Sequence, residues 1–236
     1  MNRRKPWFLA LFQPYVRRKL ARELDGVWVR GLYRTADFVH SQPVIYAANH
    51  VAWWDPLLAI ALDQAMKTEA FGIMDEHNLR KLPFFRWVGA VGIDRSEPGS
   101  AGPGLKACAE LLDRPGRALW IFPQGKQRPS HVQPLGFKTG VLRLQEMAAV
   151  PIIPVSIRYL FGERATPQVW IDFGEPLMEA DIKTIEGHVI DGLARIDYAF
   201  EHSLDEFEPL VSGSFRRSEK WLGTQALIRL AGDDEK

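Results

Sequence analysis

The sequence predicts an α/β fold, with a central mixed, largely parallel sheet flanked by helices and an N-terminal amphipathic two-helix appendage. Short apolar runs typical of buried strands alternate with stretches of helical period from about residue 26 to residue 206. Strands that alternate with helices form a sheet covered on both faces. The 236 residues and their 46% hydrophobic content suffice for one large core. We expect amphipathic helices at 1–25, the main domain at 26–210, and a C-terminal helix with a frayed tail at 211–236.

The N-terminal region combines aromatic and basic side chains. Residues 6–25 predict two short amphipathic helices broken at Pro14, and residues 1–34 carry nine Lys and Arg against two acidic residues. Such helices lie in membrane interfaces, where anionic headgroups attract the cations. The alternative is a helix pair that packs on its own domain with a solvated basic edge. The expected membrane-binding residues are Trp7, Phe8, Leu11, Phe12, Arg17, Arg18 and Lys19.

The remaining helices and strands are predicted from apolar runs, from the spacing of apolar residues, and from the Gly and Pro residues that interrupt them. Strands are predicted at 27–33, 43–48, 69–74, 117–122, 150–157 and 168–173. Helices are predicted from 55 to about 66, at 76–81, at about 105–113, from 138 to about 147, within 174–206, and at 215–230.

A histidine and an aspartate follow the second predicted strand. His50 leaves the end of that strand, and Asp55-Pro56 opens the next helix, with Asp55 expected as its N-cap. The four residues between them allow the carboxylate to reach the imidazole. An imidazole takes a proton from a hydroxyl near neutral pH, and a carboxylate on its other nitrogen fixes the tautomer. The pair therefore predicts a general base; the alternative is a half-buried histidine beside a helix cap.

Composition and motifs exclude several other classes of protein. The net charge of +1 gives no argument for a nucleic-acid partner, and the single cysteine, Cys108, excludes an internal disulfide and a Cys-rich metal site. Apolar runs fall short of the ~18 residues of a membrane span. No signal peptide is recognisable, so a cytoplasmic location is expected. The chain also lacks a Gly-x-Ser-x-Gly elbow and a His-Glu-x-x-His pair, which leaves hydrolase and zinc-enzyme interpretations unsupported.

Four blocks in fixed order carry a resemblance to a known family: Asn49-His50-x4-Asp55, Gly89-x3-Ile93-Asp94-Arg95, Phe122-Pro123-Gln124-Gly125 and Val150-Pro151-Ile152-Ile153-Pro154-Val155. Over about residues 26–175 the chain resembles the glycerolipid acyltransferases, which include the 1-acylglycerol-3-phosphate acyltransferases. The resemblance implies that His50 is the general base, oriented by Asp55. The acceptor hydroxyl would attack the thioester of acyl-CoA or acyl carrier protein directly, without an acyl-enzyme.

The same resemblance implies the substrate contacts. Arg95 would hold the acceptor through its phosphate, and the turn that begins at Phe122 would line the acceptor site. The implied substrate-binding residues are Asn49, Arg95, Phe122, Gln124, Gly125, Lys126 and Arg128. No metal or bound cofactor is implied, and the acyl thioester is a co-substrate. The protein would act as a peripheral enzyme on the cytoplasmic face of the cell membrane.

The third block departs from the family pattern Phe-Pro-Glu-Gly-Thr-Arg. Gln124 replaces the Glu, Lys126 the Thr and Gln127 the Arg, while Arg128 comes one residue late. A neutral amide suits a neutral acceptor such as a glycolipid or a carotenoid glycoside. Alternatively, Lys126 and Arg128 restore the phosphate site by another route. A non-catalytic lipid-binding protein of the same fold is the third hypothesis.

Overall fold

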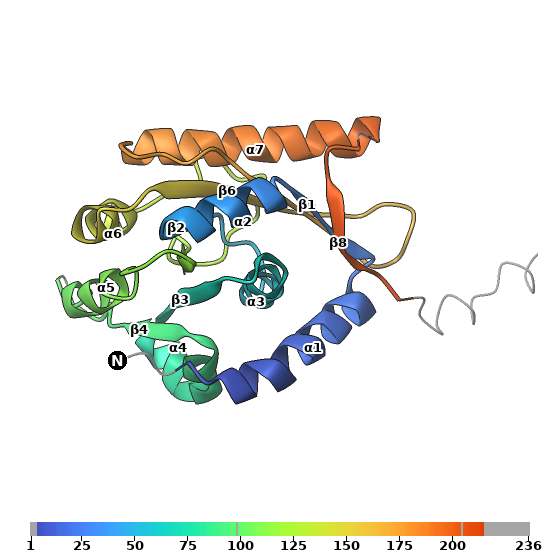
Figure 1. The fold of residues 1–236 in the computed structure, drawn as a ribbon. Coiled ribbons are helices and arrows are strands. Elements are labelled where there is room, and N and C mark those ends of the chain that lie inside the picture. The colour runs from blue at the N-terminus through green and yellow to red at the C-terminus, as the bar shows by residue number, and fades with distance from the viewer. Residues whose placement is uncertain (1–3, 98, 204, 215–236) are drawn as a thin grey trace, which may run out of the picture.

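One eight-stranded sheet organises the chain in the computed structural model, which describes residues 4–97, 99–203 and 205–214 (Figure 1). The elements in chain order are α1 (Pro6–Glu23), β1 (Gly26–Arg30), α2 (Leu32–Ser41), β2 (Val44–Ala48), α3 (Asp55–Met66), β3 (Glu69–Asp75), α4 (Glu76–Lys81), the 3-10 helix η1 (Pro83–Val88), β4 (Ala90–Ile93), α5 (Gly102–Ala109), β5 (Arg117–Ile121), α6 (Gly140–Ala148), β6 (Ile152–Leu160), β7 (Gln168–Phe173), α7 (Ile182–His202) and β8 (Glu208–Ser212).

The sheet is mixed and mostly parallel, as predicted, with strand order β4-β3-β5-β2-β6-β7-β1-β8. The five strands from β4 to β6 in this order run parallel to one another. Strand β7 is antiparallel to β6, β1 is parallel to β7, and β8 is antiparallel to β1. Helices α1, α2 and α3 pack on one face, and α5, α6 and α7 cover the other (Figure 1). The carboxyl ends of the parallel strands therefore meet at one edge, where open α/β sheets place their ligands.

The predicted break at Pro14 is wrong, because α1 is a single helix with Pro14 inside it. A proline in a helix interior removes one backbone hydrogen bond. Packing offsets this cost: Leu9 before the proline and Val16 and Leu20 after it are buried in the core shared with α3. The appendage is thus one helix that forms part of the main core.

Four elements were not predicted, namely α2, η1, β4 and β8, and the ends of some predicted elements are shifted. The strand predicted at 27–33 stops at Arg30, because Gly31 turns the chain at φ 77° and α2 begins at Leu32. The helical pattern predicted up to 206 ends at His202, and β8 follows as an edge strand against β1. The short strand β4 lies in a stretch for which no element was predicted. The helix predicted at 215–230 lies outside the described residues.

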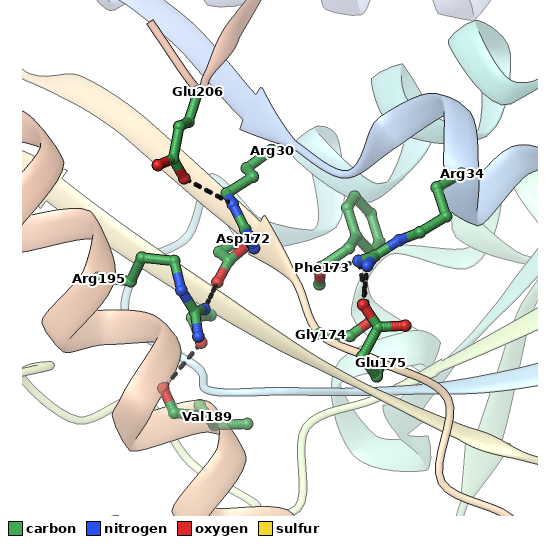
Figure 2. Close-up of polar contacts among 10 residues, drawn as sticks. Arg30, Arg34, Asp172, Phe173, Gly174, Glu175, Val189, Arg195 and Glu206 are labelled. Atoms are coloured by element: carbon green, nitrogen blue, oxygen red, sulfur yellow. Dashed lines mark hydrogen bonds and ion pairs between the residues drawn. The ribbon is translucent and has the colours of Figure 1, made fainter. Parts of the chain in front are cut away.

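A buried carboxylate joins the sheet to α7, away from the carboxyl ends of the parallel strands. Asp172 on β7 is 1% exposed; its Oδ1 accepts from Arg30 Nη1 at 3.0 Å, and its Oδ2 accepts from Arg195 on α7 (Figure 2). Arg30 also donates to Glu206, at 3.1 Å. A buried carboxylate has lost its hydration and needs such partners. The ion pairs of Asp172 thus join β7 to β1 and to α7.

Candidate active site

The loop after β2 curls back so that Asp55 meets His50. Asp55 is the first residue of α3, and its Oδ2 accepts from Nδ1 of His50 at 2.7 Å. The same oxygen accepts from the backbone N–H groups of Val51, at 2.7 Å, and Ala52, at 3.0 Å. The predicted N-cap role is therefore wrong: the carboxylate bonds the loop before the helix instead of the first helical turn. The predicted pairing with His50 is present.

This geometry assigns the imidazole tautomer. The Asp55 side chain is fully buried and, when ionised, can only accept hydrogen bonds, so Nδ1 of His50 carries the proton. Nε2 then presents its lone pair, and it has no hydrogen-bond partner within the part of the chain that is described. The His50 side chain is 20% exposed, and its ring stacks on Phe122 with centroids 4.5 Å apart. Such a nitrogen can accept a proton from a bound hydroxyl.

Tyr159, near the end of β6, contacts the other oxygen of Asp55. Its hydroxyl donates to Oδ1 at 2.6 Å. Burial, together with the charge of Asp55 and this hydrogen bond, raises the pKa of Tyr159 well above its ordinary value. The phenol therefore stays protonated and remains a donor. Sequence reasoning missed this residue, although Tyr159 closely follows the strand predicted at 150–157 and lies at the same sheet edge as His50.

The turn after β5 holds the backbone of His50 from both sides. The N–H of His50 donates to Oε1 of Gln124 at 2.5 Å, and the N–H of Arg128 donates to the His50 carbonyl at 2.9 Å. The side chains of Gln124 and Arg128 then both donate to the carbonyl of Leu135, at 3.2 Å and 2.7 Å. Gln124 is only 4% exposed. Gln124 and Arg128 therefore hold the backbone of His50. The buried Gln124 side chain is turned away from the acceptor contact predicted for it, whereas for the half-buried Arg128 that contact stays a prediction.

Asn49 is also turned inward. Its amide bonds both backbone groups of Ile157 on β6, donating to the carbonyl at 2.9 Å and accepting from the N–H at 2.7 Å. The side chain is buried, so it joins the ends of β2 and β6 and does not face a substrate. The periodicity of the sequence carries no information about which way such a loop side chain points.

A cationic rim lies beside Gly125, at the end of β5. Arg95 donates from Nη1 to the Gly125 carbonyl at 2.8 Å, and its Nε and Nη2 bond Asp75, whose pKa this contact lowers. A Cβ built on Gly125, which has φ 71°, would lie 2.8 Å from Nη1 of Arg95 and 3.4 Å from Nζ of Lys138. Lys138 and Lys126 are exposed, and neither forms an ion pair with a residue that the structure describes. Sequence reasoning missed Lys138 and Asp75.

The predicted membrane-binding residues divide between two faces of α1. Trp7 and Leu11 are 57% and 70% exposed and share the outer face with Tyr15. Phe8 and Phe12 instead face inward. The Phe8 ring contacts Phe84 and Trp87 of η1, and the Phe12 ring contacts Phe84.

The basic residues of α1 divide similarly. Arg17 donates to the Leu210 carbonyl, Lys19 lies over the Trp54 ring, and Arg18 is exposed. Only part of the predicted membrane-binding set is therefore free to meet a bilayer.

Within residues 4–97, 99–203 and 205–214, no helix combines the length and the apolar character that crossing a membrane requires. The same residues hold no group of three or more His, Cys, Asp and Glu side chains arranged to bind a metal ion.

Comparison with known proteins places these residues in context. A family model described as Acyltransferase matches residues 29–158, more than half of the chain. The chain is 29% identical over 121 residues to the 1-acyl-sn-glycerol-3-phosphate acyltransferase of Saccharomyces cerevisiae, which covers 49% of this chain and 39% of that protein. It is 28% identical over 156 residues to a probable 1-acyl-sn-glycerol-3-phosphate acyltransferase of Mycoplasma genitalium, covering 62% and 57%.

A human relative, 1-acyl-sn-glycerol-3-phosphate acyltransferase alpha, is 29% identical over 143 residues, covering 55% of this chain and 44% of that protein. The matches thus span from about two-fifths to under three-fifths of each of these curated relatives. All the residues around His50 and Asp55 described above fall within the family match, except Tyr159, which follows it by one position.

Proposed function

Since the chain belongs to the acyltransferase family, we propose that it moves a fatty acyl group from an acyl thioester to the hydroxyl of a lipid acceptor. The observation that carries the proposal is the His50–Asp55 pair, with Nδ1 occupied and Nε2 open at the carboxyl edge of the sheet. The acyl donor is acyl-CoA or acyl carrier protein. The acceptor is a 1-acylglycerol-3-phosphate, the lipid in the names of the relatives.

The reaction needs one base and no covalent enzyme intermediate. Nε2 of His50 takes the proton of the acceptor hydroxyl while the oxygen attacks the thioester carbonyl. Asp55 stabilises the imidazolium that forms. The tetrahedral intermediate then collapses, the carbon–sulfur bond breaks, and the imidazolium returns the proton to the departing thiolate. The products are the acylated lipid and the free thiol.

The cationic rim supports a phosphate-bearing acceptor. Arg95 and Lys138 flank Gly125, and Lys126 is exposed on the same turn. A phosphate favours such a group of donors over a single ion pair. The substitution of Gln124 for the family Glu no longer favours a neutral acceptor, because both ends of its amide are used inside the protein.

Membrane association is part of the same proposal. Trp7, Leu11 and Tyr15 expose an aromatic and apolar surface along α1, with Arg18 beside it. An amphipathic helix with this composition lies in the interfacial plane of an anionic bilayer. The protein would then take its acceptor from the membrane as a peripheral enzyme on the cytoplasmic face.

The test is thiol release from a long-chain acyl-CoA with 1-acylglycerol-3-phosphate as the acceptor. His50→Ala should lower kcat by about 10²–10⁴-fold, the usual effect of removing a general base. His188→Ala, on the exposed face of α7, is the matched control and should keep the wild-type rate. A panel with neutral glycolipids, scored by kcat/KM, identifies the acceptor. Near-normal turnover in the His50→Ala variant would refute the role of His50 as the general base.

A further inference from the structure

Tyr159 is the feature of the site that the reaction described above leaves without a role. The four hydrogen bonds to the Asp55 carboxylate are divided unequally: three donors share Oδ2, and Tyr159 alone donates to Oδ1 among the described residues. The carboxylate is fully buried, so water does not replace a missing donor there. Tyr159 comes from β6, 104 residues along the chain from Asp55.

We propose that Tyr159 is a positioning residue of the His50–Asp55 pair, whose hydroxyl fixes the carboxylate so that Oδ2 stays on Nδ1 of His50. The inference rests on the proposed function for its kinetic consequences. Rotation about the Cβ–Cγ bond of Asp55 would bring Oδ1 toward the imidazole and turn Oδ2 away from the loop. A donor held on Oδ1 by a rigid strand opposes that rotation.

The Tyr159 hydroxyl also disperses part of the negative charge of Asp55, and so weakens the attraction between Asp55 and a protonated His50. In its absence the carboxylate keeps three donors in place of four, so its negative charge is less dispersed. The protonated imidazolium of His50 is then stabilised more strongly by Asp55. A higher pH is therefore needed to remove the proton from Nε2. The acidic limb of the pH–rate profile therefore moves to higher pH when the hydroxyl is removed.

The test is Tyr159→Phe, which removes the oxygen and keeps the ring. We expect kcat to fall about tenfold, the order expected for a lost hydrogen bond to a charged group, with KM unchanged. The acidic limb should move up in pH. Tyr46→Phe is the matched control, because Tyr46 is another buried tyrosine, on β2. Among the described residues, its hydroxyl hydrogen-bonds the sulfur of Met66, at 3.7 Å, and not Asp55. That variant should keep the wild-type kcat and acidic limb.

A double-mutant cycle separates positioning from general packing. If Tyr159 acts through the Asp55 carboxylate, Tyr159→Phe should have little further effect on kcat in an Asp55→Ala background, which leaves the hydroxyl no carboxylate or amide to hold. Independent losses that multiply would overturn the proposal. A variant with reduced thermal stability but an unmoved acidic limb would also overturn it, since that result indicates packing alone.

A measurement that needs no enzymatic turnover separates this test from the test of the proposed function. The titration of the His50 imidazole, followed by NMR, should move to higher pH in Tyr159→Phe and stay unmoved in Tyr46→Phe. If the wild type transfers no acyl group, the proposed function fails while this titration still tests the role of Tyr159. An unmoved His50 titration in Tyr159→Phe refutes the positioning role.

Discussion

Replacing Asp55 by asparagine removes one negative charge from the centre of the site and keeps its shape. The N–H groups of Val51 and Ala52 require an acceptor where Oδ2 now lies, so the amide oxygen takes that place. It continues to accept from Nδ1 of His50, and the tautomer is preserved. The amide nitrogen then faces Tyr159, whose hydroxyl can turn and accept. The variant therefore isolates the charge from the geometry.

The expected loss follows from the distance between the charges. Nδ1 of His50 and Oδ2 of Asp55 are 2.7 Å apart, which places the centres of the two charges about 4 Å apart. At an effective permittivity of about 20, the attraction between imidazolium and carboxylate is about 4 kcal/mol. Each 1.36 kcal/mol is a factor of ten, so kcat should fall by about 10³. KM should stay unchanged, because the charge acts on the imidazolium that forms during the reaction.

The loss of stability should exceed that of a helix cap. As a cap, asparagine would replace aspartate for a few tenths of a kcal/mol, roughly. Here four donors bond a buried carboxylate, and weakening hydrogen bonds to a charged group costs about 1–3 kcal/mol. Urea denaturation measures this, and thiol release measures kcat.

Asp63→Asn is the matched control, since Asp63 is another buried aspartate on α3, away from His50. It should keep the wild-type kcat. A value of kcat within threefold of wild type in Asp55→Asn, at matched folding, would show that the charge of Asp55 is not used.

Three further predictions follow from other contacts. Replacing Trp7 and Leu11 together by serine should abolish flotation with anionic vesicles and leave turnover of a dispersed short-chain acceptor intact; retained flotation would refute the membrane role of α1. Gln124→Glu should lower kcat by about 10–100-fold and the free energy of unfolding by about 1–3 kcal/mol, because a carboxylate would face the Leu135 carbonyl; a switch in acceptor preference, measured by kcat/KM, would contradict this. Burial raises the pKa of Asp63 to about 6, so the folded state binds its proton more tightly than the unfolded state, and stability falls as pH rises through 6. Between about pH 4 and pH 7 the wild type should therefore lose about 2 kcal/mol relative to Asp63→Asn in urea titrations; parallel curves would refute it.

Most helices and strands were predictable because the spacing of apolar residues along the sequence differs between the two. The buried run at 43–48 and the apolar helix after Asp55 have strong patterns, and both are present within a residue or so. The helix α2 escaped prediction because the apolar strand β1 runs directly into it and a single residue, Gly31, separates the two. Its buried residues, Leu32, Thr35 and Val39, do carry a helical spacing that would have revealed it.

The site was predictable in its reacting pair and less so in its supports. His50 and Asp55 are close in sequence, and a short loop leaves few ways to join them. Asn49 and Gln124 lie in irregular segments, where only the folded chain decides whether an amide points to solvent or to a backbone carbonyl. Tyr159 and Lys138 depend on strand order, which local pattern does not encode.

The contacts around the base also determine when the protein becomes competent. His50 is held by Gln124, 74 residues later, while Asn49 bonds Ile157, 108 residues later. A nascent chain therefore carries the complete His50–Asp55 motif long before anything holds it in place. Closing loops of this length has an entropic cost that only the finished sheet offsets. A fragment that stops before β6 would therefore contain both residues of the pair but lack the β6 contacts of Asn49 and Asp55.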